Sequence, residues 1–236
     1  MRTDAKTAPM VHISDLLKTY DVDGQRFKAV DAVSLDVEKG EMVSIMGHSG
    51  SGKTTLLSLI GGLTRPDSGQ LLVDGAELWS MADDALSAFR NRKMSFIYQF
   101  SSLIPTLTAI ENVMLPTAFG AKTEDTFDRA SELLSLVGLK DKMNAYPSHL
   151  SGGQQRRIAI ARSFINRPKL ILADEPTGDL DEETENEMLQ LFHRMNAEHG
   201  MTFIIVTHNK EMAALANKQL LMSHGVLKNN SPNMFL

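Results

Sequence analysis

Cysteine is absent from the 236 residues of this chain. The missing thiols exclude disulfide bonds and thiolate metal sites, which favours a reducing compartment. Long apolar runs are also missing, because none approaches the ~18–20 residues that a membrane-spanning helix needs. The opening MRTDAKTAPM lacks the apolar region of a signal peptide, so we expect residues 1–10 to form a flexible tail.

An excess of positive charge is lacking as well, since the formal net charge is −5 at pH 7. This balance differs from the basic character of most nucleic-acid-binding proteins, so we expect no nucleic acid among the partners. At this length the hydrophobic share of 42% is enough to bury the core of one large domain, or of one domain with a subdomain.

The sequence does contain a regular alternation between short apolar runs and amphipathic stretches. Strands are predicted at residues 11–20, 29–40, 41–47, 69–75, 93–99, 169–174 and 201–208. Helices are predicted at residues 53–63, 82–92, 107–116, 123–139, 151–166 and 182–199, the last one closed by Gly200. Such alternation is typical of an α/β fold with a parallel sheet covered on both faces. Asp23-Gly24 predicts a hairpin turn between the first two strands.

A block of helices interrupts this alternation from about residue 99 to residue 148. We expect it to form an inserted α-helical subdomain that leads into a further helix from residue 150. The remainder, about 11–98 and 149–236, is expected to form the core of a single domain over residues 11–236.

The segment GHSGSGKT fits the phosphate-binding loop G-x-x-x-x-G-K-[ST] and lies between a predicted strand and a predicted helix. Its glycines let successive N–H groups point at phosphate oxygens, and the helix N-terminus adds its dipole. We expect Lys53 to reach the β- and γ-phosphates and the Thr54 hydroxyl to hold Mg²⁺. The alternative, an ordinary Gly/Ser turn, is disfavoured by the strand–loop–helix context. The nucleotide-binding residues predicted here are Gly47, His48, Ser49, Gly50, Ser51, Gly52, Lys53, Thr54 and Thr55.

The segment LILADE supplies the acidic partner that a Mg²⁺-nucleotide site needs at the end of a neighbouring strand. Asp174 is predicted to bind the metal, and Glu175 to act as general base for the attacking water. Alone, two acids at a strand end are often simple caps. Beside a phosphate-binding loop the functional interpretation is favoured.

Three further positions follow the same reasoning. Gln99 ends a predicted strand and is a candidate ligand of Mg²⁺, while His208 ends another strand and is a candidate contact of the γ-phosphate. Tyr20 ends the first strand and is a candidate to stack on adenine. Taken alone, Gln99 and His208 are more often ordinary surface or packing residues at such positions, and for Tyr20 the two interpretations are evenly balanced.

The stretch LSGGQQ, residues 150–155, has no acid, nucleophile or metal ligand, yet it begins a predicted helix. Ser151 is a good N-cap, and Gly152 and Gly153 expose backbone N–H groups that suit an anion. With GHSGSGKT, LSGGQ, LILADEPTGDLD and His208 in this order, the sequence resembles the ABC-type ATPases over about residues 11–227.

This resemblance implies a P-loop fold of ABC type: a mostly parallel sheet, an N-terminal antiparallel β subdomain and the inserted α-helical subdomain. It implies ATP hydrolysis with Glu175, His208 and Lys53 as catalytic residues. It also implies an ATP-dependent homodimer in which LSGGQ of one subunit closes head to tail over the ATP of the other. The residues expected to reach that ATP across the interface are Ser151, Gly152, Gly153, Gln154 and Asp181.

The segments SSLIPTLTAIENVMLP and EPTGDLD resemble the group that serves lipoprotein release and macrolide-type export. The resemblance implies a peripheral subunit on the cytoplasmic face of the inner membrane, with a separate permease docked on the helical subdomain. Candidates for the docking groove, if they are not ordinary core residues, are Phe100, Leu103, Ile104 and Leu107.

Two other functions stay open. One is mechanical regulation without transport, as in the cell-division ATPase of the same group. The other is action on DNA or ribosomes, which the single phosphate-binding loop disfavours. The chain also departs from the family pattern: TAFGAKTED is short, ARSF replaces ARAL, and Asn209 stands where Asp is usual.

Overall fold

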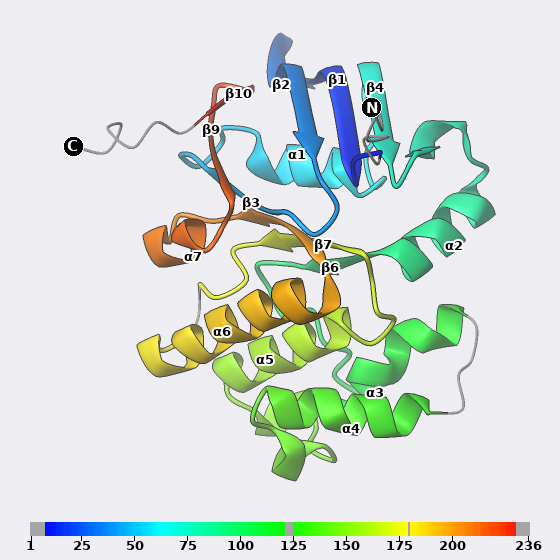
Figure 1. Ribbon diagram of the computed structural model, residues 1–236, viewed down its shortest axis with the longest axis vertical. Helices are drawn as coiled ribbons and strands as arrows, with labels where there is room; N and C mark the ends of the chain where they lie inside the picture. Colours follow the sequence, from blue (N-terminus) through cyan, green and yellow to red (C-terminus); the bar gives the residue numbers. More distant parts are fainter. Residues whose placement is uncertain (1–7, 121–124, 179, 230–236) are drawn as a thin grey trace, which may run out of the picture.

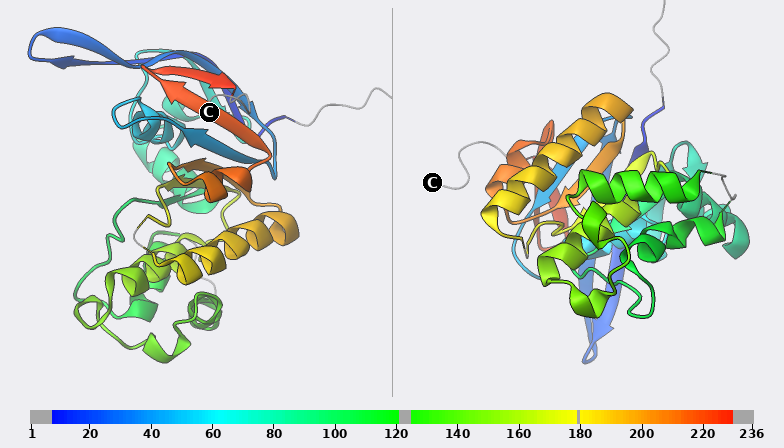
Figure 2. Two further views of the ribbon diagram at one scale, coloured as in Figure 1. Left: turned by 90° about the vertical axis from the view of Figure 1, so that its left-hand side faces the viewer. Right: turned by 90° about the horizontal axis from the view of Figure 1, so that it is seen from below.

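The computed structural model describes residues 8–120, 125–178 and 180–229, which fold around two sheets (Figure 1). The first is a four-stranded antiparallel sheet with the order β2-β1-β4-β5. Its strands are β1 (Val11–Val22), β2 (Gln25–Val37), β4 (Ser68–Val73) and β5 (Ala76–Glu77). Asp23 and Gly24 both have positive φ, as a two-residue hairpin turn requires, so the predicted hairpin is confirmed. Figure 2 shows this hairpin projecting beyond the rest of the molecule.

The second sheet has six strands in the order β10-β9-β3-β8-β7-β6. Every neighbouring pair is parallel except β9 and β10 at one edge, which confirms the predicted mostly parallel core. Its strands are β3 (Met42–Met46), β6 (Met94–Ile97), β7 (Leu170–Asp174), β8 (Thr202–Val206), β9 (Lys218–Ser223) and β10 (Val226–Asn229).

Helices cover both faces of this sheet. The helices of the described residues are α1 (Lys53–Ile60), α2 (Asp83–Lys93), α3 (Ala109–Met114), α4 (Thr126–Leu136), α5 (Gly152–Ser163), α6 (Glu182–His199) and α7 (Lys210–Ala214), of which α3 and α4 belong to the helical insertion. Short 3₁₀ turns are η1 (Leu78–Ser80), η2 (Leu115–Phe119), η3 (Lys140–Lys142) and η4 (Pro147–His149). Gly200 ends α6 in the left-handed conformation, as its sequence position predicts.

Alternate residues of the central strands build two separate cores. In β7, Leu170 and Leu172 face a core shared by α1 and the antiparallel sheet, whereas Ile171 and Ala173 face a core shared by α3 to α6. Full burial of each such aliphatic side chain stabilises the fold by about 1.5–3 kcal/mol. The uninterrupted apolar runs of the sequence therefore reflect strands that are covered on both faces.

The predicted helical insertion is present between β6 and α5, in the lower part of Figure 1. Its helix α3 begins with a capping box between Thr108 and Glu111.

Near the N-terminus, Met10 is buried and donates its N–H to the carbonyl of Val37, so this residue of the predicted tail belongs to the folded structure. Residues 1–7 of the predicted tail lie outside the described residues, and the division into subdomains stays a prediction.

Candidate active site

The loops that follow β3, β6, β7 and β8 meet at one edge of the parallel sheet. Val206 of β8 pairs with Ile45 on one side and with Asp174 on the other, so three strands end level. On the far side of β7, Ile97 of β6 pairs with Ala173. Because all four strands are parallel, the segments after their carboxyl ends converge there, at the edge where open α/β sheets bind ligands.

The phosphate-binding loop joins β3 to α1 in a conformation that depends on glycine. Gly47 and Gly52 have φ of 152° and 104°. A Cβ atom on Gly47 would lie 2.2 Å from the carbonyl oxygen of Met222, and one on Gly52 would lie 1.9 Å from that of Ala29. Larger residues are excluded at both positions, so the backbone wraps tightly against β9 and β2.

Lys53, the first residue of α1, folds back over this loop. Its Nζ donates to the carbonyl oxygens of Gly47 at 2.7 Å and His48 at 2.9 Å. Partial burial lowers the pKa of Lys53, and the nearby carboxylates of Glu175 and Asp174 oppose this shift. A phosphate group entering the loop would offer the ammonium group stronger, charged acceptors than these carbonyls.

Thr54 and Asp174 are 120 residues apart in sequence, yet the Thr54 hydroxyl donates to Oδ2 of Asp174 at 2.8 Å. Burial raises the pKa of Asp174, and the hydrogen bond from Thr54 opposes this. A hydroxyl and a carboxylate oxygen at this distance are the hard oxygen donors that Mg²⁺ prefers, completed by phosphate and water. Among the described residues, no group of three or more His, Asp or Glu side chains is arranged to hold a metal ion.

Glu175 follows Asp174 in the left-handed region, with φ of 46°. Its Oε1 lies 2.9 Å from Nδ1 of His208, and its Oε2 accepts from the Thr207 hydroxyl at 3.2 Å and the His208 N–H at 3.3 Å. The carboxylate is thus oriented by the loop after β8 and held beside the cavity.

A cavity of about 680 Å³ contains all the residues predicted to bind the nucleotide within one chain. It is lined by Tyr20, Phe27, Ala29, the phosphate-binding loop at 47–55, Gln99, Asp174, Glu175 and His208. The sequence prediction missed Phe27, which pairs with Tyr20 across the hairpin. The available signal is the alternation of β2, which places Phe27 and Ala29 on the same face.

The residues predicted to act across a dimer interface lie elsewhere. Ser151 caps α5 through a capping box with Gln154, and Asp181 caps α6 by accepting from the Thr184 N–H at 2.9 Å. None of the five interface candidates lines the cavity of its own chain. In the described part of the molecule, the cap leaves the N–H groups of Gly152 and Gly153 without a side-chain partner. Asp179, within the predicted GDLD segment, lies outside the described residues.

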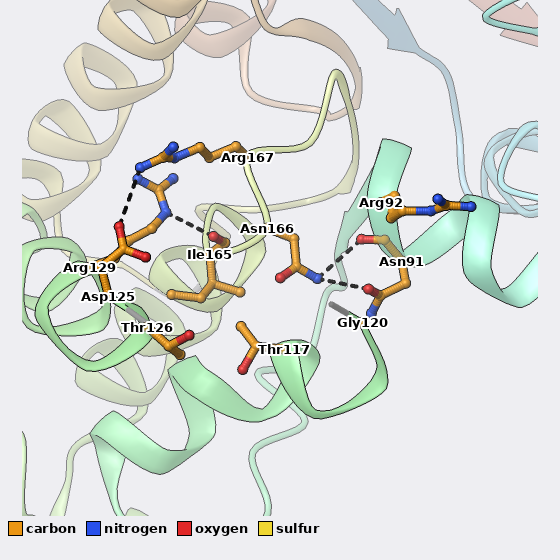
Figure 3. A pocket seen from close by; sticks show the side chains of 10 residues that line it. All are labelled: Asn91, Arg92, Thr117, Gly120, Asp125, Thr126, Arg129, Ile165, Asn166 and Arg167. Atoms are coloured by element: carbon orange, nitrogen blue, oxygen red, sulfur yellow. Dashed lines mark hydrogen bonds and ion pairs between the residues drawn. The ribbon is translucent and has the colours of Figure 1, made fainter. Parts of the chain in front are cut away.

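A second, smaller cavity of about 170 Å³ lies between α2, η2, α4 and the turn after α5 (Figure 3). Arg129 donates from Nε to the carbonyl of Ile165 and from Nη2 to that of Phe164, both at 2.8 Å. Asn166 donates to the backbone carbonyl of Asn91 at 3.1 Å. These bonds tie the helical insertion to the core, and none of the predicted site residues is present.

Fold and site together define a P-loop nucleotide-hydrolysing domain with a helical insertion. Residues 30–178 match the family described as ABC transporter. The chain belongs to this family and is an ABC-type ATPase, as the sequence motifs predict.

Similar proteins agree with this placement. The "Lipoprotein-releasing system ATP-binding protein LolD" of Bordetella avium (strain 197N) is 44% identical over 95% of this chain and 98% of its own length. The "Macrolide export ATP-binding/permease protein MacB" of Rhodopirellula baltica is 42% identical over 92% of this chain, which spans 32% of that protein. The ATP-binding cassette MJ0796, solved as a dimer in a post-hydrolysis state bound to ADP and Pi, superimposes with a TM-score of 0.88. It is 39% identical over 93% of this chain and 98% of its own.

These relatives are ATP-binding proteins of transport systems, and the dimeric cassettes support the predicted dimer. No helix in the described segments combines the length and the apolar character needed to cross a bilayer.

Proposed function

We propose that Glu175 is the general base of ATP hydrolysis in a head-to-tail dimer of this chain, and that the dimer powers a separate membrane permease. The supporting observation is the pair formed by Glu175 and His208, 2.9 Å apart at the wall of the cavity that contains the phosphate-binding loop. A carboxylate oriented in this way beside a phosphate cradle suits the activation of water.

In the proposed reaction Glu175 takes a proton from water, and the water oxygen bonds to the γ-phosphorus. The bond from that phosphorus to the β,γ-bridging oxygen breaks, which yields ADP and phosphate. Lys53 and the N–H groups of the loop hold the β- and γ-phosphates, and His208 orients Glu175 and contacts the γ-phosphate. Tyr20 stacks on the adenine ring.

Thr54, Asp174 and Gln99 would hold Mg²⁺, because all three line the cavity and each carries a side-chain oxygen. When bound, Mg²⁺ would neutralise charge on the phosphate oxygens. The residues of this chain supply orientation: Thr54 and Asp174 already lie in hydrogen-bond contact, so little rearrangement is needed to present both oxygens.

The second half of the nucleotide site comes from another copy. The partner subunit's Ser151, the partner subunit's Gly152 and the partner subunit's Gly153 would approach the γ-phosphate with backbone N–H groups and a helix dipole. The partner's Gln154 and the partner's Asp181 would complete the interface. Two copies related by a two-fold axis then enclose two ATP molecules.

The identity of the transported cargo is the more specific part of the proposal. The similarity to LolD and to MacB favours lipoprotein release or macrolide-type export through a separate permease. The chain would then be a peripheral protein at the cytoplasmic face of the inner membrane, with no nucleic acid as partner. Mechanical regulation without transport is the second candidate, because it requires the same catalytic residues.

The proposed docking groove is formed by the segment just past Gln99, where Leu103 is partly buried against the core and Phe100 and Ile104 are exposed. Phe100 is 75% exposed and Ile104 is 41% exposed there, so two large apolar side chains of one short segment are available to a partner. This exposure supports a permease segment as the occupant, since such segments present apolar surface.

The test is co-expression of the tagged full chain with a candidate permease from the same organism. Ile104→Asp should abolish recovery of the permease, because a charge would enter the groove. Leu136→Asp is the matched control, since Leu136 is 42% exposed on α4 outside the groove. Equal recovery with both variants would reject the groove. Transport of a lipoprotein or macrolide by the intact complex in vesicles would support transport, whereas ATP turnover without cargo movement would favour mechanical regulation.

A further inference from the structure

A chain of hydrogen bonds runs behind the catalytic pair and includes Glu185, which the sequence did not single out. Glu185 lies in the first turn of α6 and is half-buried. Its Oε1 accepts from the hydroxyl of Thr177 at 2.5 Å and from Nδ2 of Asn209 at 2.8 Å. One carboxylate oxygen thus joins the segment after β7 to the loop after β8.

The same chain of bonds continues to the proposed general base. The N–H of Asn209 donates to the Thr207 hydroxyl at 3.0 Å, and that hydroxyl donates to Oε2 of Glu175 at 3.2 Å. Thr207 is 1% exposed and Thr177 is 3% exposed, so both hydroxyls are shielded from water. Hydrogen bonds in such surroundings hold their geometry more firmly than exposed ones.

The identity of residue 209 fits this arrangement. An amide at this position donates Nδ2 to Glu185, while its Oδ1 accepts from the N–H groups of Glu211 and Met212 and caps α7. An Asp at this position would also cap α7, but it would set two carboxylates against each other. The amide of Asn209 and the carboxylate of Glu185 are therefore complementary at this contact.

We infer that Glu185 is a positioning residue for hydrolysis. Through Asn209 and Thr207 it fixes the loop that orients Glu175 and His208. Through Thr177 it connects this loop to the segment that leads to the dimer interface. The inference rests on the proposed role of Glu175. It adds that the catalytic pair is held by the carboxylate–amide contact between Glu185 and Asn209.

Asn209→Asp is the discriminating variant, because it keeps the α7 cap and the side-chain size but replaces the donor to Glu185 by a second carboxylate. Displacement of catalytic groups by about 1 Å can lower turnover by about 100-fold. We expect kcat of the full-length chain to fall by about 10- to 100-fold, with the KM for ATP unchanged, since the phosphate-binding loop is untouched.

The double variant Asn209→Asp/Glu185→Gln exchanges donor and acceptor across the same contact and should restore most of the lost kcat. A purely structural role predicts no such rescue. Glu187→Gln, an exposed site on the same helix, is the matched control and should behave as the original chain. Thermal unfolding of each variant shows that the folded state persists. If Asn209→Asp does not remain folded, Glu185→Ala gives the same test, because it removes the acceptor of both Thr177 and Asn209 and should lower kcat alone.

A fall in kcat at constant KM with rescue by the double variant supports the inference. An unchanged kcat, a parallel rise in KM, or a double variant no better than Asn209→Asp overturns it. Glu175→Gln separates this outcome from failure of the proposed function: if that variant loses hydrolysis while the Glu185 contact proves irrelevant, only the present inference fails.

Discussion

Replacing Glu175 by Gln removes a proton acceptor and changes little else. The amide has the same size and keeps one oxygen. This oxygen can accept from the Thr207 hydroxyl and the His208 N–H, which lie 3.2 Å and 3.3 Å from Oε2 of Glu175. What is lost is the basic oxygen beside His208. The variant should therefore fold normally and retain the cavity.

The expected loss of turnover follows from the role of the group. General-base catalysis contributes about 100- to 10,000-fold to a rate, which corresponds to about 3–5 kcal/mol of activation free energy at 1.36 kcal/mol per tenfold. The Kd for ATP should not change, because the contacts expected from Lys53 and the phosphate-binding loop are untouched. The variant is thus predicted to bind ATP without consuming it.

Steady-state phosphate release and calorimetric titration with ATP measure the two quantities separately. Glu187→Gln, the same chemical change at an exposed site of α6, controls for the loss of one negative charge. If Glu175→Gln retained turnover within threefold of the original chain, Glu175 would not be the base. Loss of ATP binding together with turnover would point to a damaged cavity.

Three further changes probe other parts of the account. Lys53→Ala should weaken ATP binding by about 2–5 kcal/mol, measured by calorimetry; unchanged affinity would count against the phosphate-binding role. Tyr20→Ala should weaken it by about 1–3 kcal/mol, the usual worth of base stacking on an aromatic, whereas Tyr20→Phe should bind normally. Asp74, whose side chain is 10% exposed, contacts three lysines at 2.8–3.3 Å, and these bonds lower its pKa. Asp74→Asn should therefore lower the free energy of unfolding by about 2 kcal/mol at pH 7. The difference between the two proteins in urea unfolding should shrink below about pH 4, because the carboxylate becomes protonated there. A difference that stays constant down to pH 2 would refute this role of Asp74.

The cavity could be predicted from sequence because its parts are local motifs placed by a general rule. GHSGSGKT specifies its own loop, and the carboxyl ends of parallel strands must share one edge, which brings Asp174 to Thr54. The antiparallel hairpin could also be predicted from the sequence, because Asp23 and Gly24 adopt the turn conformation that their residue types favour.

Other features could not be predicted because they depend on tertiary contacts between segments without a motif. β9 and β10 were not predicted. Phe27 enters the cavity only through its pairing with Tyr20. The contact between Glu185 and Asn209 joins two helix starts 24 residues apart. The sequence showed that Asn209 departs from the family pattern, but the role of this residue depends on which side chain it contacts.

The central claim is that one chain holds only half of each nucleotide site. Size-exclusion chromatography with light scattering on Glu175→Gln, with and without ATP, measures it most directly. Gly152→Asp in the same background is the decisive partner variant. A Cβ at Gly152 meets nothing within 4 Å, and an acid suits the first turn of a helix, so the monomer should be intact. We predict an ATP-dependent dimer of Glu175→Gln that Gly152→Asp abolishes while ATP binding persists. A monomer at saturating ATP, or a dimer unaffected by the carboxylate, would contradict the account.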